Sequence, residues 1–272
     1  MRQNVLVTAA MLAFAGNSLL CRLALRSTAI DAGSFTGIRV AAGALTLWLI
    51  LRLSGRVVGG SWGSGAALFV YAAAFSFAYV ALPAAVGALL LFGAVQVSMI
   101  GYAVLRGERP GGVKLAGIAL AVLGLVLLLL PGLAAPSPVH AALMLAAGVA
   151  WGVYSVRGRA PGDPTAATAG NFLRAVPFAA ALAALTARDV DAAGALYAVL
   201  SGAVASGLGY AVWYAALRGL GATQAATVQL SVPVLAAFGG VALLGEPLTP
   251  RLVVCSAAIL GGIALVIRPE RL

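Results

Sequence analysis

Residues 78–82 read Ala-Tyr-Val-Ala-Leu, and residues 213–217 read Trp-Tyr-Ala-Ala-Leu. Each stretch is followed by a long apolar run and then by a Gly-Glu pair, which begins at Gly107 in the first case and at Gly245 in the second. Another apolar run with spaced glycines follows each pair. The sequence from residue 78 to residue 130 is therefore written twice, which indicates an internal duplication.

The spacing between the two copies is nearly constant. Tyr79 and Tyr214 lie 135 positions apart, and Glu108 and Glu246 lie 138 positions apart. A three-residue insertion near residues 218–222 accounts for the difference. An offset close to half the chain length means that the fold must be interpreted as two related units.

The composition determines the class of protein. Of the 272 residues, 62% are hydrophobic and 9% are charged, and the mean hydropathy is +1.06. Soluble domains carry roughly 25% charged residues, so this chain is expected to be a polytopic membrane protein. The net charge of +10 fits basic loops that orient the chain in a membrane better than it fits a nucleic-acid-binding surface.

Ten apolar segments are long enough to cross a bilayer, at about 20 residues each. We predict spans at residues 4–25, 34–53, 63–82, 84–105, 112–131, 138–156, 165–186, 193–217, 221–244 and 249–267. The first segment also resembles a signal peptide, with Ala13-Phe14-Ala15 as a cleavage site. We reject that alternative because the apolar run continues through Leu20, and because cleavage would remove one element of the duplication.

Loop charges predict the orientation. If the N-terminus is cytoplasmic, eleven basic residues fall on the cytoplasmic side and four on the other side, which favours both termini in the cytoplasm. Five spans per half is an odd number, so the two halves enter the membrane from opposite sides. We therefore predict an all-α fold of ten transmembrane helices in two inverted five-helix repeats, residues 1–133 and 134–272. Such repeats are typical of secondary transporters.

The paired motifs resemble the EamA-type carriers of the drug/metabolite transporter superfamily. The resemblance rests on the two Tyr-x-Ala-Leu stretches, the two Gly-Glu pairs, the glycines that follow them, and the counterpart residues Arg39 and Arg174. It covers essentially the whole chain, and it implies a central substrate cavity lined by helices 1, 3, 4, 6, 8 and 9, with helices 5 and 10 outside. The chain length and the aromatic residues of helices 3, 6 and 8 look like those of bacterial aromatic amino acid exporters. The chain departs from the family pattern in helix 4, where Val95-Gln96 replaces a proline that helix 9 keeps as Pro233.

Polar side chains inside membrane segments are candidates for solute binding, because they are costly to leave in lipid. The candidates are Asn17, Gln96, Ser98 and Gln229, and also Asn171, Gln224 and Ser231. Hydrogen bonding between helices is the alternative role for each of them.

Aromatic residues recur at helical spacing and form a second set of candidates: Phe75, Tyr79, Trp151, Tyr154, Tyr210, Trp213 and Tyr214. Spacings of three and four place each group on one helix face. Such a face can stack an aromatic solute, with a hydroxyl or an indole N–H as its polar group. Membership of an interfacial aromatic belt is the alternative, particularly for Tyr79 and Tyr214, which lie near helix ends.

The charged residues in and beside the segments have two interpretations. Arg39 and Arg174 can bind a carboxylate or anchor a helix, and their presence in both halves favours anchoring. Glu108 and Glu246 precede the fifth and tenth segments, where a carboxylate stabilises a helix N-terminus, so we interpret both as caps. No acidic residue lies in the middle of a predicted span, so we expect transport driven by a solute gradient rather than by proton exchange.

The sequence contains no nucleotide-binding loop, no H-E-x-x-H motif, and only Cys21, Cys255 and His140 as soft metal ligands. We therefore expect no enzyme activity, cofactor or metal, and no nucleic-acid partner. The expected function is a secondary carrier that exports small organic solutes by alternating access, with amino acids, including aromatic ones, as the best fit. The alternatives are export of amines, nucleobases or drugs, and a channel-like facilitator. Its expected partners are the solute and the lipid bilayer, and a monomer is expected to suffice for transport.

Overall fold

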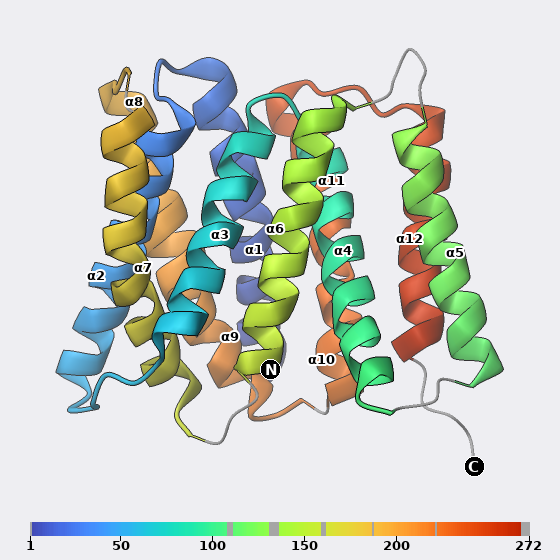
Figure 1. The fold of residues 1–272 in the computed structure, drawn as a ribbon, viewed down its shortest axis with the longest axis horizontal. Coiled ribbons are helices and arrows are strands. Elements are labelled where there is room, and N and C mark those ends of the chain that lie inside the picture. The colour runs from blue at the N-terminus through green and yellow to red at the C-terminus, as the bar shows by residue number, and fades with distance from the viewer. Residues whose placement is uncertain are drawn as a thin grey trace.

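The computed structural model describes residues 2–107, 111–130, 136–158, 162–186, 188–220 and 222–267, and throughout these ranges the regular structure is helical (Figure 1). Seven helices precede the first irregularity: α1 (Arg2–Ser27), α2 (Ala32–Leu53), α3 (Trp62–Tyr79), α4 (Ala84–Leu105), α5 (Gly112–Leu129), α6 (Pro138–Arg157) and α7 (Pro164–Thr186). The later elements combine into longer helical segments, which we call rods, and each of the first seven helices counts as one rod. The eighth rod consists of α8 (Ala192–Val199), the π-helical segment η1 (Leu200–Leu208) and α9 (Gly209–Leu217). The ninth is α10 (Ala222–Gln229) with α11 (Ser231–Leu244), and the tenth is α12 (Pro250–Ile267).

These ten rods of the described chain confirm the predicted fold class. By length and composition, nine of them are able to cross a membrane within the described ranges. The remaining predicted span, residues 63–82, corresponds to α3, whose glycine, serine and aromatic residues make it less apolar. It packs between α6 and α7 in the bundle. The helix ends at Tyr79, three residues before the predicted end.

The ninth rod is interrupted, whereas its counterpart α4 is continuous. The interruption falls at Leu230, three residues before Pro233. Proline has no N–H to donate to the carbonyl four residues earlier, and its ring crowds that carbonyl. The residue difference between Val95-Gln96 and Pro233 therefore matches a difference in helix geometry.

The packing of the helices follows the duplication. Counterpart helices pack on each other in three cases, α2 on α7, α4 on α11, and α5 on α12. The contact between α3 and α6 has its own counterpart in the contact of α1 with η1 and α9. Exchanging the two halves therefore preserves these main contacts, as expected for two related repeats. The predicted boundary at residues 133 and 134 lies outside the described residues.

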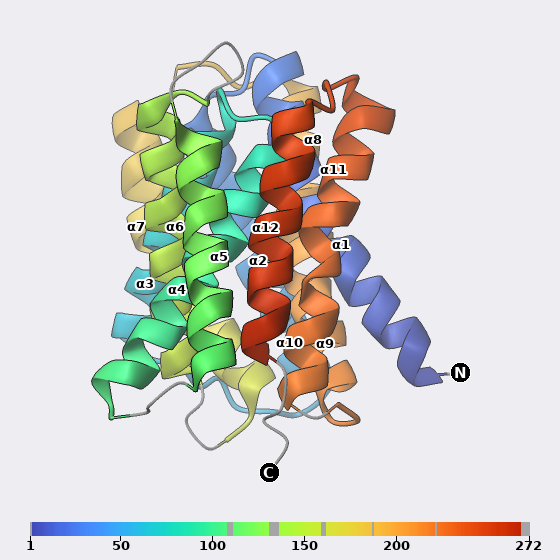
Figure 2. The same cartoon turned by 90° about the vertical axis from the view of Figure 1, so that its right-hand side faces the viewer.

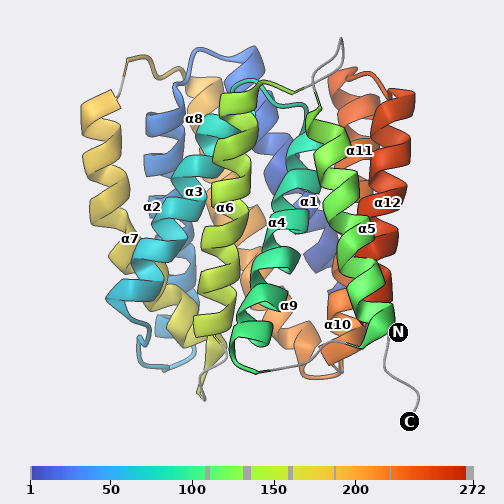
Figure 3. The same cartoon turned by 45° about the vertical axis from the view of Figure 1, so that its right-hand side comes forward.

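The start of α1 and the end of α12 lie at the same end of the bundle, which we call the terminal end (Figures 1 and 2). The other end is the opposite end. α5 and α12 stand together at one edge, away from α2 and α7 (Figure 3). This is the peripheral place that the family resemblance implies for helices 5 and 10.

The contact between α5 and α12 depends on two glycines. A Cβ atom built on Gly262 would lie 2.5 Å from the carbonyl oxygen of Gly117, and one built on Gly117 would lie 2.6 Å from the carbonyl oxygen of Gly262. Small residues allow this close approach of membrane helices. Gly261, the neighbouring residue, has nothing within 4 Å of its Cβ position.

We expect Gly262→Ala to lower the unfolding temperature in detergent, because the new methyl group must push two backbones apart, at a cost of about 1–3 kcal/mol. Gly261→Ala is the matched control and is expected to leave that temperature unchanged or slightly raised, since alanine favours the helix. Equal destabilisation by both substitutions would contradict this account of the contact.

Candidate functional site

A cavity of about 380 Å³ lies between the two halves of the bundle. Its walls come from α1 and α4 of the first half and from α6, α7, α9 and α10 of the second. Gly158, Pro164 and Leu217 stand at helix ends and contribute to these walls, so the cavity reaches the terminal end. Eight residues proposed from the sequence line it: Gln96, Trp151, Tyr154, Asn171, Tyr210, Trp213, Tyr214 and Gln229.

The cavity wall is polar in places but carries no charged side chain among the described residues that line it. Its polar groups are amides and hydroxyls, and its apolar surface is largely aromatic. A wall of this kind suits a small organic solute, because aromatic surface supplies contact area and a few polar groups fix the orientation.

One side of the cavity has a connected set of hydrogen bonds. The Thr168 hydroxyl is 2.8 Å from the Tyr214 hydroxyl and accepts a hydrogen bond from the Tyr154 hydroxyl at 3.2 Å. Asn171 donates from Nδ2 to the Tyr154 hydroxyl at 3.5 Å, and its Oδ1 accepts from the Ser61 N–H at 2.9 Å. Thr168 was not among the sequence candidates, although it lies three residues from Asn171 on α7, and that spacing was the available signal.

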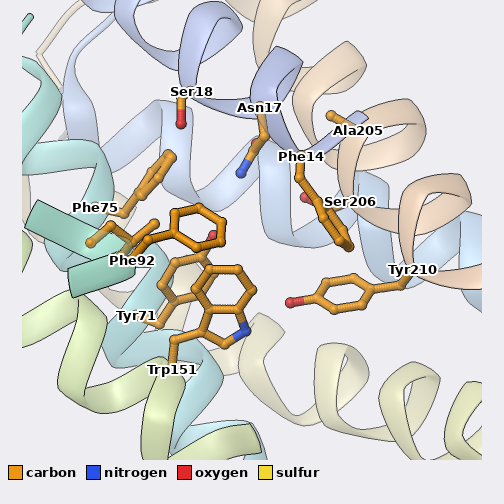
Figure 4. Close-up of a pocket in the computed structure, with 11 residues that line it drawn as sticks. Phe14, Asn17, Ser18, Tyr71, Phe75, Phe92, Trp151, Ala205, Ser206 and Tyr210 are labelled. Carbon is orange, nitrogen blue, oxygen red and sulfur yellow. The ribbon is translucent and has the colours of Figure 1, made fainter. Parts of the chain in front are cut away.

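A smaller pocket of about 20 Å³ (Figure 4) shares part of its lining with the large cavity. Four aromatic residues line both spaces, and we call them the aromatic collar: Phe14, Phe92, Trp151 and Tyr210. The Trp151 ring stacks on Tyr71, with centroids 5.3 Å apart, and meets Phe92 edge-on at 5.4 Å. The collar therefore separates the large cavity from the small pocket.

Asn17 and Phe75, both proposed from the sequence, line the small pocket with Tyr71. The Ser201 hydroxyl donates to Asn17 Oδ1 at 2.6 Å. This bond fixes the amide, so that its nitrogen points into the pocket (Figure 4). Ser201 belongs to η1, whose π-helical turns the sequence pattern did not reveal.

Four of the proposed residues line neither space: Tyr79, Ser98, Gln224 and Ser231. Tyr79 is fully buried, its hydroxyl donates to the Ala84 carbonyl at 3.2 Å, and its ring packs against Gly87. Ser98 donates to the Val95 carbonyl of its own helix at 2.9 Å and faces Gly152 where α4 meets α6. In this structure the side chains of Tyr79 and Ser98 therefore serve helix packing.

The opposite end of the bundle is held by a buried ion pair. Arg22 Nε lies 3.1 Å from Glu246 Oε1, and Arg22 Nη1 donates to the carbonyls of Tyr79 and Val80 at 3.0 and 2.9 Å. The other carboxylate oxygen of Glu246 accepts from the Ala84 N–H at 2.7 Å. We call Arg22, Glu246 and the N-terminus of α4 the Arg22–Glu246 cluster. It joins α1, the end of α3, the start of α4 and the loop before α12.

The cluster corrects one expectation. Glu246 was interpreted as a cap of the helix that follows it, but it caps the N-terminus of α4, a helix of the other half. The reason is tertiary, because the loop before α12 folds over the start of α4. Glu108, its counterpart in the sequence, lies outside the described residues.

The two arginines paired by the duplication have different surroundings. Arg174 donates from Nη1 to the carbonyls of Gly59 and Gly170 at 2.7 and 2.9 Å, and so anchors the loop between α2 and α3. Arg39 has no comparable contact with the backbone among its recorded hydrogen bonds, and donates to the Tyr71 hydroxyl at 3.3 Å.

The described carboxylates lie at helix ends. Burial acts to raise the pKa of Asp31, but hydrogen bonds from Ser34 and from the Arg188 N–H hold it below its ordinary value. Burial likewise acts to raise the pKa of Asp163, but the hydrogen bond from Arg56 and those from backbone N–H groups hold it below its ordinary value. Both groups are therefore ionised at neutral pH. The part of the chain that the structure describes has no group of three or more side chains able to hold a metal ion.

Comparison with known proteins agrees with this geometry. The model of the EamA-like transporter family matches residues 140–268, which form most of the second repeat. A relative from Pseudomonas aeruginosa, named "Uncharacterized protein PA1977", is 60% identical over 275 residues, covering 99% of this chain and 96% of its own length. One solved crystal structure of a protein has the same fold, with a TM-score of 0.69 and 22% identity, over 97% of this chain and 96% of that one.

The family match falls on one repeat, and the internal duplication relates the other repeat to it. Proteins of this family are membrane transporters of small solutes rather than enzymes. This protein is a multi-pass membrane protein with a cavity between two related halves, and its residues 140–268 match the EamA-like transporter family.

Proposed function

We propose that this protein is a secondary carrier of the bacterial inner membrane that exports small organic solutes by alternating access, with amino acids, including aromatic ones, as the best-fitting class. The single observation that supports this most is the cavity of about 380 Å³ that both halves line. Pockets for small ligands in proteins are about 300–1,000 Å³.

The two ends of the bundle support the alternating mechanism. The cavity reaches the terminal end, whereas the Arg22–Glu246 cluster holds helices of both halves together at the opposite end. Two inverted halves can exchange their conformations, which gives a second state that opens at the opposite end. The excess of basic loops places the terminal end in the cytoplasm, so the structure corresponds to the inward-facing state of this proposal.

The proposed driving force is the gradient of the solute itself. Proton-coupled carriers generally place a titratable group within the membrane, and the described carboxylates lie at helix ends instead. Uphill transport that follows an imposed pH gradient in proteoliposomes would contradict this part of the proposal.

A counterflow experiment with purified protein in proteoliposomes tests the function. Vesicles preloaded with an unlabelled solute are expected to accumulate the labelled solute transiently, with saturable kinetics, for at least one member of a panel of amino acids, amines and nucleobases. A channel-like facilitator, the second candidate, would give unsaturable flux without counterflow. Absence of counterflow across the panel would count against the carrier.

We expect Thr168→Val to raise the KM for the transported solute about three- to tenfold. The substitution removes the group that joins the Tyr154 and Tyr214 hydroxyls, and one neutral hydrogen bond contributes about 0.5–1.5 kcal/mol. Tyr197→Phe on α8 is the control, because Tyr197 does not line the cavity, and its KM is expected to match that of the wild type. An unchanged KM for Thr168→Val would show that the hydrogen-bonded group of Tyr154, Thr168 and Tyr214 is not part of the solute site.

A further inference from the structure

Arg39 lies in the middle of α2 and is 3% exposed. Its Nη2 donates to the Tyr71 hydroxyl at 3.3 Å, and its guanidinium carbon lies 4.7 Å from the centroid of the Phe75 ring and 5.5 Å from that of Tyr71. Its Nη1 atom is buried and has no hydrogen-bond partner. A buried guanidinium with an unused donor is costly to the protein.

The charge of Arg39 is not neutralised by a carboxylate among the described residues. The two ion pairs among the described residues join Arg22 to Glu246 and Arg56 to Asp163. The two aromatic faces offset part of the burial cost through cation–π attraction, but they do not cancel the charge. The counterpart Arg174 instead donates to two backbone carbonyls, those of Gly59 and Gly170. These are the contacts of an arginine that only anchors the backbone.

The rings that cover Arg39 also line the small pocket. Tyr71 and Phe75 face the pocket together with Asn17, whose amide nitrogen points into it (Figure 4). The guanidinium is therefore separated from the pocket by one layer of aromatic side chains. At about 20 Å³ the pocket has room for about one or two water-sized groups, which suits the end of a solute but not a whole solute.

Building on the proposed carrier function, we propose that the small pocket receives the carboxylate of the solute, so that the protein selects solutes bearing a carboxylate over amines. Asn17 Nδ2 donates to the carboxylate, and Arg39 stabilises it by its positive potential, acting through Tyr71 rather than by contact. The remainder of the solute lies against the aromatic collar and in the large cavity.

The chemistry of the surroundings favours an anion at this place. In a low-dielectric interior a cation attracts an anionic group and repels an ammonium group over several ångströms. The wall of the large cavity, as far as it is described, offers no carboxylate to bind an amine. An amino acid would place its carboxylate inward, with the ammonium group on the adjacent carbon turned toward the large cavity.

Equilibrium binding to the purified protein tests this assignment with three matched probes: 3-phenylpropionate, 3-phenylpropanamide and 3-phenylpropylamine. The wild type is expected to bind the carboxylate at least tenfold more tightly than the amide, and the amine least tightly. Arg39→Met is expected to lose the preference for the carboxylate while keeping its affinity for the amide. Arg39→Lys, which keeps the charge, is expected to retain most of the preference.

Arg174→Met is the matched control, since its arginine holds only backbone carbonyls, and it is expected to leave the ratio of carboxylate to amide affinity unchanged. Tyr71→Phe removes only the hydroxyl, which is hydrogen-bonded to both Arg39 and Asn17. It tests the assignment if Arg39→Met fails to fold, and it is expected to reduce the ratio. Equal binding of carboxylate and amide by the wild type, or a preference that survives in both Arg39→Met and Tyr71→Phe, would overturn the assignment. Counterflow in the same preparation is read separately, so a failure of the carrier function is distinguished from a failure of carboxylate selection.

Discussion

Replacing Glu246 with glutamine is expected to reduce the rate of counterflow at least tenfold and to lower the unfolding temperature in detergent. Glu246 is 7% exposed, and its two carboxylate oxygens bind Arg22 Nε at 3.1 Å and the Ala84 N–H at 2.7 Å. Removing one partner of a buried ion pair typically costs about 3–5 kcal/mol, because the other charge is left buried and unpaired.

The effect on transport follows from the position of the cluster. In the alternating-access mechanism proposed above, the cluster holds the opposite end closed in the state that opens at the terminal end, so its loss would destabilise that state relative to the other. A change of about 3 kcal/mol is enough to alter the ratio of two states by more than a hundredfold.

Asp191→Asn provides the control for this prediction. Asp191 precedes α8 at the same end of the bundle and accepts a hydrogen bond from the Gly194 N–H at 3.3 Å. Asparagine is an equally good cap, so this variant loses one negative charge at the same end without breaking an ion pair. It is expected to transport like the wild type. Full transport and normal stability of Glu246→Gln would show that the cluster does not hold the opposite end closed.

The substitution Trp151→Ala is expected to reduce transport at low solute concentration by more than tenfold. Trp151 lines both the large cavity and the small pocket, and its ring packs on Tyr71 and Phe92. Truncating a packed tryptophan costs about 3–5 kcal/mol. Here part of that cost falls on the packing of the aromatic collar, and part falls on the binding of the solute proposed to occupy the cavity. Trp151→Phe keeps a ring and is expected to recover part of the activity.

Trp62→Ala serves as the control for the loss of a tryptophan. Trp62 is 61% exposed at the start of α3, and its aromatic partner is Phe178, away from the cavity. The KM of this variant in counterflow is expected to be that of the wild type. If Trp151→Ala had the same KM as the wild type, the aromatic collar would have no role in binding.

The sequence was sufficient to predict the fold because its information is repeated. The helices at residues 84–105 and 165–186 match α4 and α7 to within one residue at each end, since apolar runs bounded by proline, glycine and charged residues locate membrane helices directly. The duplication then supplied the inverted arrangement.

The candidate site was predicted less completely, because its contacts join segments that are distant in sequence. Tyr154 and Tyr214 were recognised as candidates, but Thr168, which joins them, was missed. Its three-residue spacing from Asn171 was the available signal, but spacing alone does not distinguish a binding residue from a packing residue. Tyr71 was not among the candidates, although its ring stacks on Trp151 and lines the small pocket.

The arginines show the same limit most clearly. Arg39 and Arg174 are identical in type and occupy equivalent positions in the two repeats. The structure gives Arg174 two backbone carbonyls and gives Arg39 two aromatic faces. Symmetry of sequence does not require symmetry of contacts, since in one conformational state the two halves of an inverted repeat adopt different arrangements.

Protection of an introduced cysteine tests most directly whether the cavity between the two halves holds the transported solute. Ser155 lines the cavity on α6, whereas Val153, two residues earlier, is 48% exposed on the surface of the bundle. Both positions are changed to cysteine in a protein whose buried Cys21 and Cys255 are replaced by alanine. A solute that shows counterflow is predicted to slow modification of Ser155→Cys by a thiol reagent several-fold and to leave Val153→Cys unaffected. Modification of Ser155→Cys at the same rate with and without saturating solute would contradict the account.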